Sequence, residues 1–203
     1  MGQAKIRKTE IDALKSANQN WLLSLNDEAK KTIADVALRA HENIVVKLNM
    51  TGACYLLAMF LARYLSQEKG IEVTPVVGYV NDGTGHIMTS HAWIEYDGMK
   101  TDISLTKTEY EHAQLTGDLL IHNYSWTKGK ASYTYHYEQN SAGLAAIKNL
   151  LTKDDEMRAI IQHKEQEHQF MQSVIKTKAG IDEFLASAPS NRNYQALASY
   201  IRK

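Results

Sequence analysis

A cysteine, a histidine and an aspartate in the middle of this chain have the residue types of a nucleophile, a general base and a carboxylate that orients the base. Cys54 is the only cysteine and opens an apolar stretch. His91 lies in a segment rich in β-branched and aromatic residues, and Asp102 follows it beyond an Asp-Gly pair. A thiolate can attack an acyl carbon to form a thioester, while an imidazole accepts and returns the proton.

The segment that carries Cys54 reads as a central buried helix over residues 54–67, because it is apolar nearly all round. Thr51 is the predicted N-cap, and Gly70 ends the segment. A sulfur in the first turn lies near unpaired N–H groups and the positive end of the helix dipole, which favour the thiolate. The N–H of Cys54 is also placed to face an oxyanion.

The segments around Asp97-Gly98 predict a hairpin, with strands over residues 87–96 and 99–103. If Asp97 and Gly98 are the two loop residues, the directly opposed pairs follow from the register.

In this register Trp93 faces Asp102, and His91 shares the face of Trp93 because side chains alternate along a strand. His91 and Asp102 are then diagonal neighbours, close enough for their side chains to meet. Asp102 can accept a hydrogen bond from the imidazole and leave the other ring nitrogen for Cys54. A shift of one residue in register would move Asp102 to the opposite face.

The rest of the chain predicts helices before and after this sheet, an α+β pattern. One or two helices are expected over residues 3–25, and a second one, capped by Asn26 or Asp27, to about Lys47. Further strands are expected over residues 73–80, 123–126 and 131–137, the last two joined by residues 128–130, and helices from Ser141 onward, including 154–178 and two short final ones. This divides the chain into an N-terminal helical segment (1–48), a core (49–140) and a C-terminal helical extension (141–203).

Gly-Ala-Cys opening an apolar helix, His-Ala-Trp-Ile-Glu at residues 91–95 and Asp102 after an Asp-Gly turn together resemble the transglutaminase-like superfamily, part of the wider papain-like cysteine enzymes. The chain resembles the bacterial transglutaminase-like cysteine peptidase type, and the resemblance covers roughly residues 50–105. It implies a papain-like core, with a central helix packed on an antiparallel sheet and flanking helices. It also implies a catalytic Cys54, His91 and Asp102 that form a thioester acyl-enzyme.

The sequence departs from this family at two places. Tyr55 stands where many transglutaminases have Trp after the cysteine. The upstream side chain that often completes the oxyanion hole has no clear match, and Asn49 is the candidate. Nothing in the sequence resembles a calcium site.

Substrate contacts are expected from Trp93, Tyr55 and His86, although Trp93 also suits packing beside the triad and His86 an ordinary loop position. Glu95 reads as a solvated strand residue or a second carboxylate. The alternating Tyr133, Tyr135 and Tyr137 read as sheet core or sheet-to-helix contact, with a substrate-binding wall as the alternative.

No metal or organic cofactor is implied by the pattern of possible ligands. His163 and His168 are five residues apart in a predicted helix, whereas helical ligand pairs are roughly three or four apart. His112 likewise lacks ligand spacing.

Composition excludes several classes of protein. The chain has 203 residues, with 23 basic and 23 acidic side chains, so no nucleic-acid partner and no membrane surface are indicated. Its longest apolar stretch, residues 55–65, is interrupted by Arg63 and is shorter than the ~20 residues that span a bilayer. With a polar N-terminus and a single cysteine, we expect a cytoplasmic location.

The leading hypothesis is a cysteine-dependent acyl-transfer enzyme that hydrolyses a peptide or amide bond in a peptide or protein substrate. An acyltransferase or transglutaminase with an amine acceptor is one alternative. Another is a non-catalytic interaction module on the same scaffold, since a lone buried cysteine is usually a small core residue. The apolar stripe of the C-terminal helices predicts packing on the core, or else a homo-oligomer or partner interface.

Overall fold

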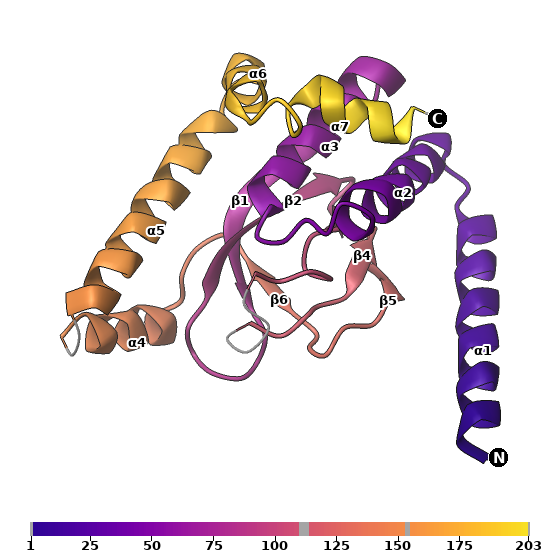
Figure 1. Cartoon of the computed structure of the whole chain (residues 1–203), viewed down its shortest axis with the longest axis horizontal. Helices are drawn as coiled ribbons and strands as arrows, with labels where there is room; N and C mark the ends of the chain where they lie inside the picture. The colour runs from indigo at the N-terminus through magenta and orange to yellow at the C-terminus, as the bar shows by residue number, and fades with distance from the viewer. Residues whose placement is uncertain (1, 110–113, 153–154, 203) are drawn as a thin grey trace.

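Helices from both ends of the chain enclose a sheet formed by its middle (Figure 1). The computed structural model describes residues 2–109, 114–152 and 155–202. His112 and the predicted helix start at Asp154 lie outside the described residues. The order of helix, sheet and helix confirms the predicted α+β class.

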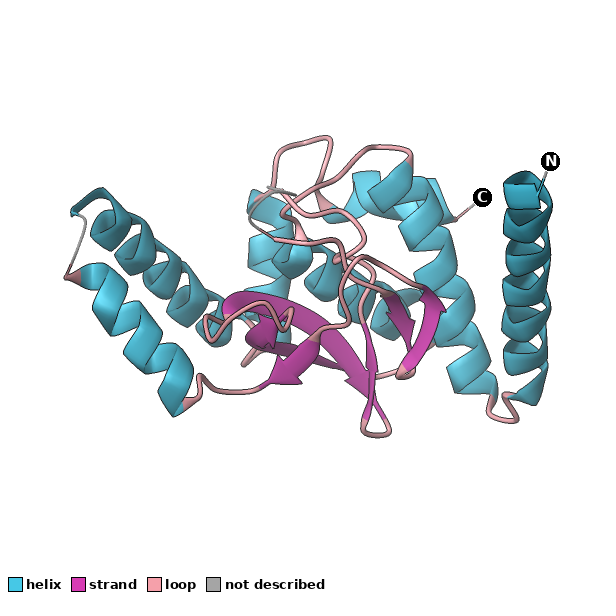
Figure 2. Ribbon diagram, turned by 90° about the horizontal axis from the view of Figure 1, so that it is seen from below, coloured by secondary structure: helices cyan, strands magenta, loops and turns pink. Residues whose placement is uncertain are grey.

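The first four helical elements are α1 (Gly2–Ser24), α2 (Glu28–Ala40), the π-helical segment η1 (His41–Val46) and α3 (Cys54–Lys69). The strands are β1 (Thr74–Asn81), β2 (Thr89–Tyr96), β3 (Met99–Thr101), β4 (Leu119–Ile121), β5 (Tyr124–Thr127) and β6 (Thr134–His136). The helices α4 (Ser141–Leu151), α5 (Asp155–Val174), α6 (Lys178–Ser187) and α7 (Tyr194–Ile201) follow. Figure 2 shows the strands at the centre of the fold, with helices to either side.

The predicted hairpin register is confirmed. The four-stranded sheet has the order β3-β2-β1-β6, with antiparallel neighbours. Tyr96 pairs with Met99 and Ile94 with Thr101, as the two-residue Asp-Gly turn requires. Asp102 continues this edge through an antiparallel bridge to Leu120 of β4, so β4 and β5 form a two-stranded sheet beside the first.

The expected strands over residues 123–126 and 131–137 are present as β5 and β6, but they pair with different partners. β5 pairs with β4, and β6 pairs with the far edge of β1. Residues 128–130, which were expected to join the two strands directly, fold back toward Thr116. The N–H groups of Lys130 and Ala131 both donate to its carbonyl oxygen. β4 was not predicted, because it is three residues long and lacks the alternation that marks a strand.

α3 is the central buried helix that the sequence predicts. It packs against β1 and β2 on one side and against α2, α6 and α7 on others. Met59, Phe60 and Leu65 are fully buried in this core. The helix ends at Gly70, whose φ of 67° is the left-handed conformation expected of a C-cap glycine.

The N-terminal region begins with one helix, α1, which leads into α2. The carboxylate of Asp27 caps α2 by accepting hydrogen bonds from the N–H groups of Ala29 and Lys30. The helical segment ends near Lys47, as predicted. The chain changes from α-helical to π-helical after Ala40.

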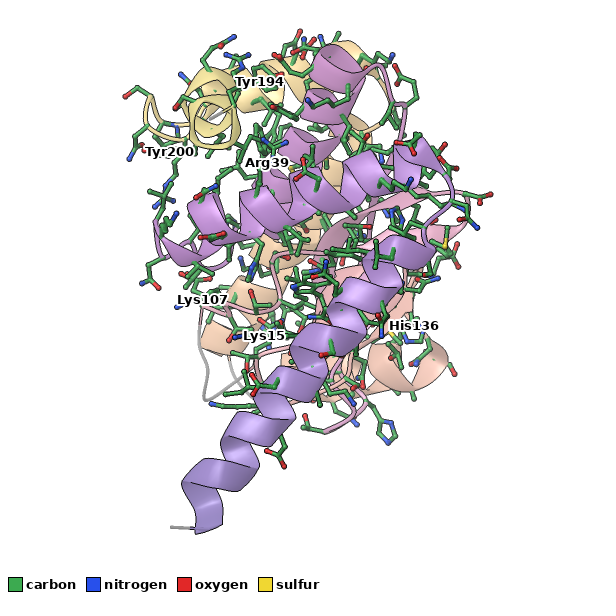
Figure 3. The ribbon with its side chains drawn as sticks, turned by 90° about the vertical axis from the view of Figure 1, so that its right-hand side faces the viewer. Lys15, Arg39, Lys107, His136, Tyr194 and Tyr200 are labelled. Carbon is green, nitrogen blue, oxygen red and sulfur yellow. The ribbon has the colours of Figure 1, made fainter. Side chains whose placement is uncertain are left out.

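The apolar stripe of the final helices packs on the core, as predicted. The buried residues of α6 and α7 are Ile181, Leu185, Leu197, Ala198 and Ile201. Arg39 of α2 donates to the carbonyl oxygen of Ile201 at 2.5 Å, which ties α2 to the last residue of α7. Figure 3 shows Arg39 on α2 near α7, the helix that carries Tyr194 and Tyr200. Within the described part of the chain, no helix combines the length and apolar character that crossing a membrane requires.

Candidate active site

His91 and Asp102 form a buried hydrogen-bonded pair. The distance between His91 Nε2 and Asp102 Oδ2 is 2.6 Å, and the two residues are 3% and 2% exposed. The hairpin register produces this contact, because it puts both side chains on one face of β2 and β3. Sequence reasoning therefore located both partners.

Three further donors hold the Asp102 carboxylate. Oδ1 accepts from the backbone N–H of Ser104 at 2.9 Å and from its hydroxyl at 2.8 Å, while Oδ2 accepts from the hydroxyl of Tyr135 at 2.9 Å. Burial alone would raise the pKa of Asp102, but the charge of His91 and these hydrogen bonds hold it below its usual value. The carboxylate is thus kept ionised beneath the ring.

Neither Ser104 nor Tyr135 was assigned this role from the sequence. A signal for Ser104 exists, since an aspartate commonly accepts a hydrogen bond from the N–H two residues later. Tyr135 had no such signal, because the pairing of β6 with β1 brings it to Asp102 from a distant part of the chain. Burial and the negative charge of Asp102 raise the pKa of Tyr135, so its hydroxyl keeps the proton that it donates.

Cys54 is the first residue of α3 and is partly exposed. The predicted N-cap at Thr51 is wrong. Gly52, with a φ of 61°, turns the chain, and Ala53 occupies the N-cap position. Among the described residues no side chain caps this helix, and its first backbone bond runs from Leu57 N–H to Ala53 O at 2.9 Å. The N–H groups of the first turn therefore have no capping side chain and lie beside the sulfur.

The imidazole of His91 interacts electrostatically with both Asp102 and Cys54. Nε2 contacts Asp102, which leaves Nδ1 as the ring nitrogen available to the thiol. Burial alone would lower the pKa of His91, but the charges of Asp102 and Cys54, together with their hydrogen bonds, raise it to about 10. The arrangement thus favours a protonated ring between a sulfur and a carboxylate.

This raised pKa should make the stability of the fold depend on pH. The pKa of His91 is about 10 in the folded protein, against 6.5 for an ordinary histidine. Its stabilising effect is therefore complete below pH ~6.5 and is lost as the pH rises through about 10. We expect the free energy of unfolding to fall between pH ~6.5 and 10 by up to ~1.4 kcal/mol per pH unit.

Urea unfolding at several pH values across this window measures the slope. His91→Gln is the comparison, since it keeps a hydrogen-bond donor but cannot titrate, and other groups contribute equally to both proteins. A wild-type slope no steeper than that of His91→Gln would contradict the assigned charge state.

A cavity of about 490 Å³ opens beside Cys54. Cys54, His91 and Ser104 line one end of it, and α4 and α5 contribute to its other walls. Tyr55, one of the predicted substrate contacts, also lines it, and its hydroxyl lies 2.6 Å from Ser90 Oγ.

Two other predicted substrate contacts lie elsewhere. Trp93 is buried behind His91, with ring centroids 6.5 Å apart, and donates its indole N–H to Glu95 at 2.8 Å. His86 is exposed in the loop between β1 and β2, and Asn49 is exposed with its amide oxygen bound by Lys107 at 3.0 Å. Neither His86 nor Asn49 is among the described residues that line the cavity.

The three tyrosines near β6 do not form a common wall. Tyr135 binds Asp102, Tyr133 donates to the carbonyl oxygen of Leu115 at 2.6 Å, and the exposed Tyr137 donates to Glu95 at 2.9 Å. Glu95 is therefore occupied by hydrogen bonds from Trp93 and Tyr137.

His163 and His168 have different surroundings in the structure. His163 is exposed, whereas His168 is buried, stacks on Tyr79 with ring centroids 4.3 Å apart and hydrogen-bonds Ser90 through Nδ1. Burial lowers the pKa of His168, which favours its neutral form. Within the described residues no group of three or more His, Cys, Asp or Glu side chains is arranged to hold a metal ion.

Comparisons with protein-family models, with curated proteins and with solved structures find no match to this chain.

Proposed function

We propose that this protein is a cysteine-dependent acyl-transfer enzyme that hydrolyses a peptide or amide bond through a thioester on Cys54. The observation that carries the proposal is the buried His91–Asp102 pair, which leaves one ring nitrogen of His91 free at a cavity that the thiol of Cys54 also lines. A packing histidine has no need of an ionised buried carboxylate, whereas a general base that must become charged does.

The chemistry follows from the positions of these groups. The sulfur of Cys54 attacks the carbonyl carbon, and the negative charge on the carbonyl oxygen is stabilised by uncapped N–H groups at the start of α3. His91 gives its proton to the leaving amine as the C–N bond breaks, which leaves the thioester. A water molecule then loses a proton to His91 and attacks the thioester, releasing the acid and the thiolate. An amine that reaches the thioester first would give acyl transfer instead.

The scaffold supports the same proposal at the level of the fold. The start of a central helix lies against a β-hairpin that supplies the histidine and the aspartate, in the chain order Cys54, His91, Asp102. This is the arrangement that the transglutaminase-like resemblance implies, so we propose a papain-like core of this type.

The test is the pH dependence of alkylation at Cys54. We expect reaction with iodoacetamide at neutral pH and below to be faster in the wild type than in His91→Gln, because a protonated ring beside the sulfur favours the thiolate. Mass spectrometry of the intact protein gives the rate at each pH, and Cys54→Ala gives the background. Titration like an ordinary thiol, with a profile that His91→Gln leaves unchanged, would reject the enzyme and favour the interaction module.

A further inference from the structure

The cavity beside Cys54 changes character along its length. At one end lie the thiol, the imidazole and the hydroxyl of Ser104. Toward the C-terminal helices the lining is aliphatic, from side chains of α4, of α5 and of the loop before β2: Ile147, Leu150, Ile160, Ile161, Ile87 and Met88.

Several of these aliphatic side chains remain open to solvent. Ile87 is 47% exposed and Ile160 is 49% exposed, although both line the cavity. The neighbouring helices α6 and α7 instead bury their apolar residues against the core. A ligand that covered Ile87 and Ile160 would remove apolar surface from water, which is favourable in proportion to the area covered.

The charged groups around the cavity do not select strongly for one sign. Lys107 and Lys164 line it together with Glu109, Glu165 and Glu167. Lys164 and Glu167 pair with each other at 3.0 Å, and Lys107 is held by the amide oxygen of Asn49. Because both signs are present and partly paired, the lining offers a cationic or anionic group little advantage over an aliphatic one.

We propose that this cavity receives an aliphatic portion of the acyl group, so that the acyl donor is selected by an apolar chain between its carbonyl and the helices α4 and α5. This inference rests on the proposed function, since it places the carbonyl at Cys54. The aliphatic group belongs either to a straight acyl chain or to the side chain of an amino acid in a peptide. In both cases the bond from sulfur to carbonyl carbon forms and the bond to the leaving group breaks.

The first experiment follows acylation of Cys54 by p-nitrophenyl acetate, butyrate and hexanoate, with release of p-nitrophenolate as the readout. We expect the second-order rate constant to rise by up to roughly fourfold for each buried methylene group. Esters of N-acetylglycine and N-acetylleucine form a second arm. If the N-acetylleucine ester reacts faster than the N-acetylglycine ester while the straight-chain esters react equally fast, the cavity holds a peptide side chain. If the rate rises along the straight-chain series while the two amino acid esters react equally fast, it holds an acyl chain.

Variants of α5 connect this selectivity to the cavity. Ile161→Ser changes a lining residue and should flatten whichever series is steep. Phe170→Ser is the matched control, because Phe170 is 58% exposed on the same helix and is not among the described lining residues. Equal effects of the two substitutions would overturn the assignment of this wall.

Binding to Cys54→Ala separates the two proposals. Hexanamide should bind this variant more tightly than acetamide, by ligand-observed NMR, and Ile161→Ser should remove the difference. If hexanamide binds more tightly than acetamide but no ester acylates Cys54 in the wild type, the proposed enzyme activity is rejected and the proposed binding of an apolar ligand is kept. If acylation depends on Cys54 but neither ester series nor amide binding shows a preference, the apolar selectivity is overturned and the enzyme stands.

Discussion

Replacing His91 with alanine should slow acylation of Cys54 by p-nitrophenyl acetate by about 10²- to 10⁴-fold at neutral pH, because the sulfur loses its proton acceptor and the adjacent positive charge. The raised pKa of His91, caused by Asp102 and Cys54, and its hydrogen bond to Asp102 place it at the centre of the site. Stopped-flow release of p-nitrophenolate measures the rate, and Cys54→Ala gives the rate without a nucleophile.

This substitution also leaves the buried carboxylate of Asp102 without its charged partner, a change that can destabilise a fold by several kcal/mol. His91→Gln is therefore the necessary second variant, since its amide can still donate to Asp102. His163→Gln, on the exposed surface of α5, is the matched control and should react like the wild type. A folded His91→Gln protein that acylates as fast as the wild type would exclude His91 as the base.

Asp102→Asn should reduce the same rate by about 10³-fold with little change in size or shape, an effect of the kind seen when the carboxylate of a Ser-His-Asp triad becomes an amide. The reason lies in the four donors around the carboxylate. The backbone N–H of Ser104 cannot rotate, so the amide oxygen must stay on that side. The amide nitrogen then faces His91 Nε2, which must accept a hydrogen bond, and the ring proton moves to the nitrogen that Cys54 needs.

Asp35→Asn is the control for this change, because Asp35 is an exposed carboxylate in an ion pair with Arg39 on α2. Tyr135→Phe gives an independent check, since it removes one donor to Asp102 while leaving the base in place. We expect a much smaller loss of rate from it than from Asp102→Asn. If Asp102→Asn reacts at the wild-type rate while circular dichroism shows an intact fold, Asp102 does not orient the base.

The parts of the site that could be predicted are those that local chain geometry determines. A two-residue Asp-Gly turn sets the register of β2 and β3, and the register alone brings His91 to Asp102. The apolar run after Ala53 likewise predicts the buried helix that starts at Cys54. Each of these inferences needed only a short segment of sequence.

The parts that could not be predicted depend on contacts between distant segments. Tyr135 reaches Asp102 because β6 pairs with β1, and the aliphatic wall of the cavity comes from helices far along the chain. No local pattern encodes which strand lies beside which. The predicted N-cap at Thr51 was wrong for a different reason, because Gly52, in the left-handed conformation, separates Thr51 from the start of the helix.

Ala53 at the start of α3 has a consequence for the evolution of this protein. Serine, threonine, asparagine or aspartate at such a position commonly stabilises a protein by ~1 kcal/mol relative to alanine, by occupying the free amide groups. Here those amides are the groups on which the proposed reaction relies, so a polar side chain that improved thermal tolerance would compete with the substrate. Selection for heat resistance and selection for turnover should therefore favour different residues at this one position.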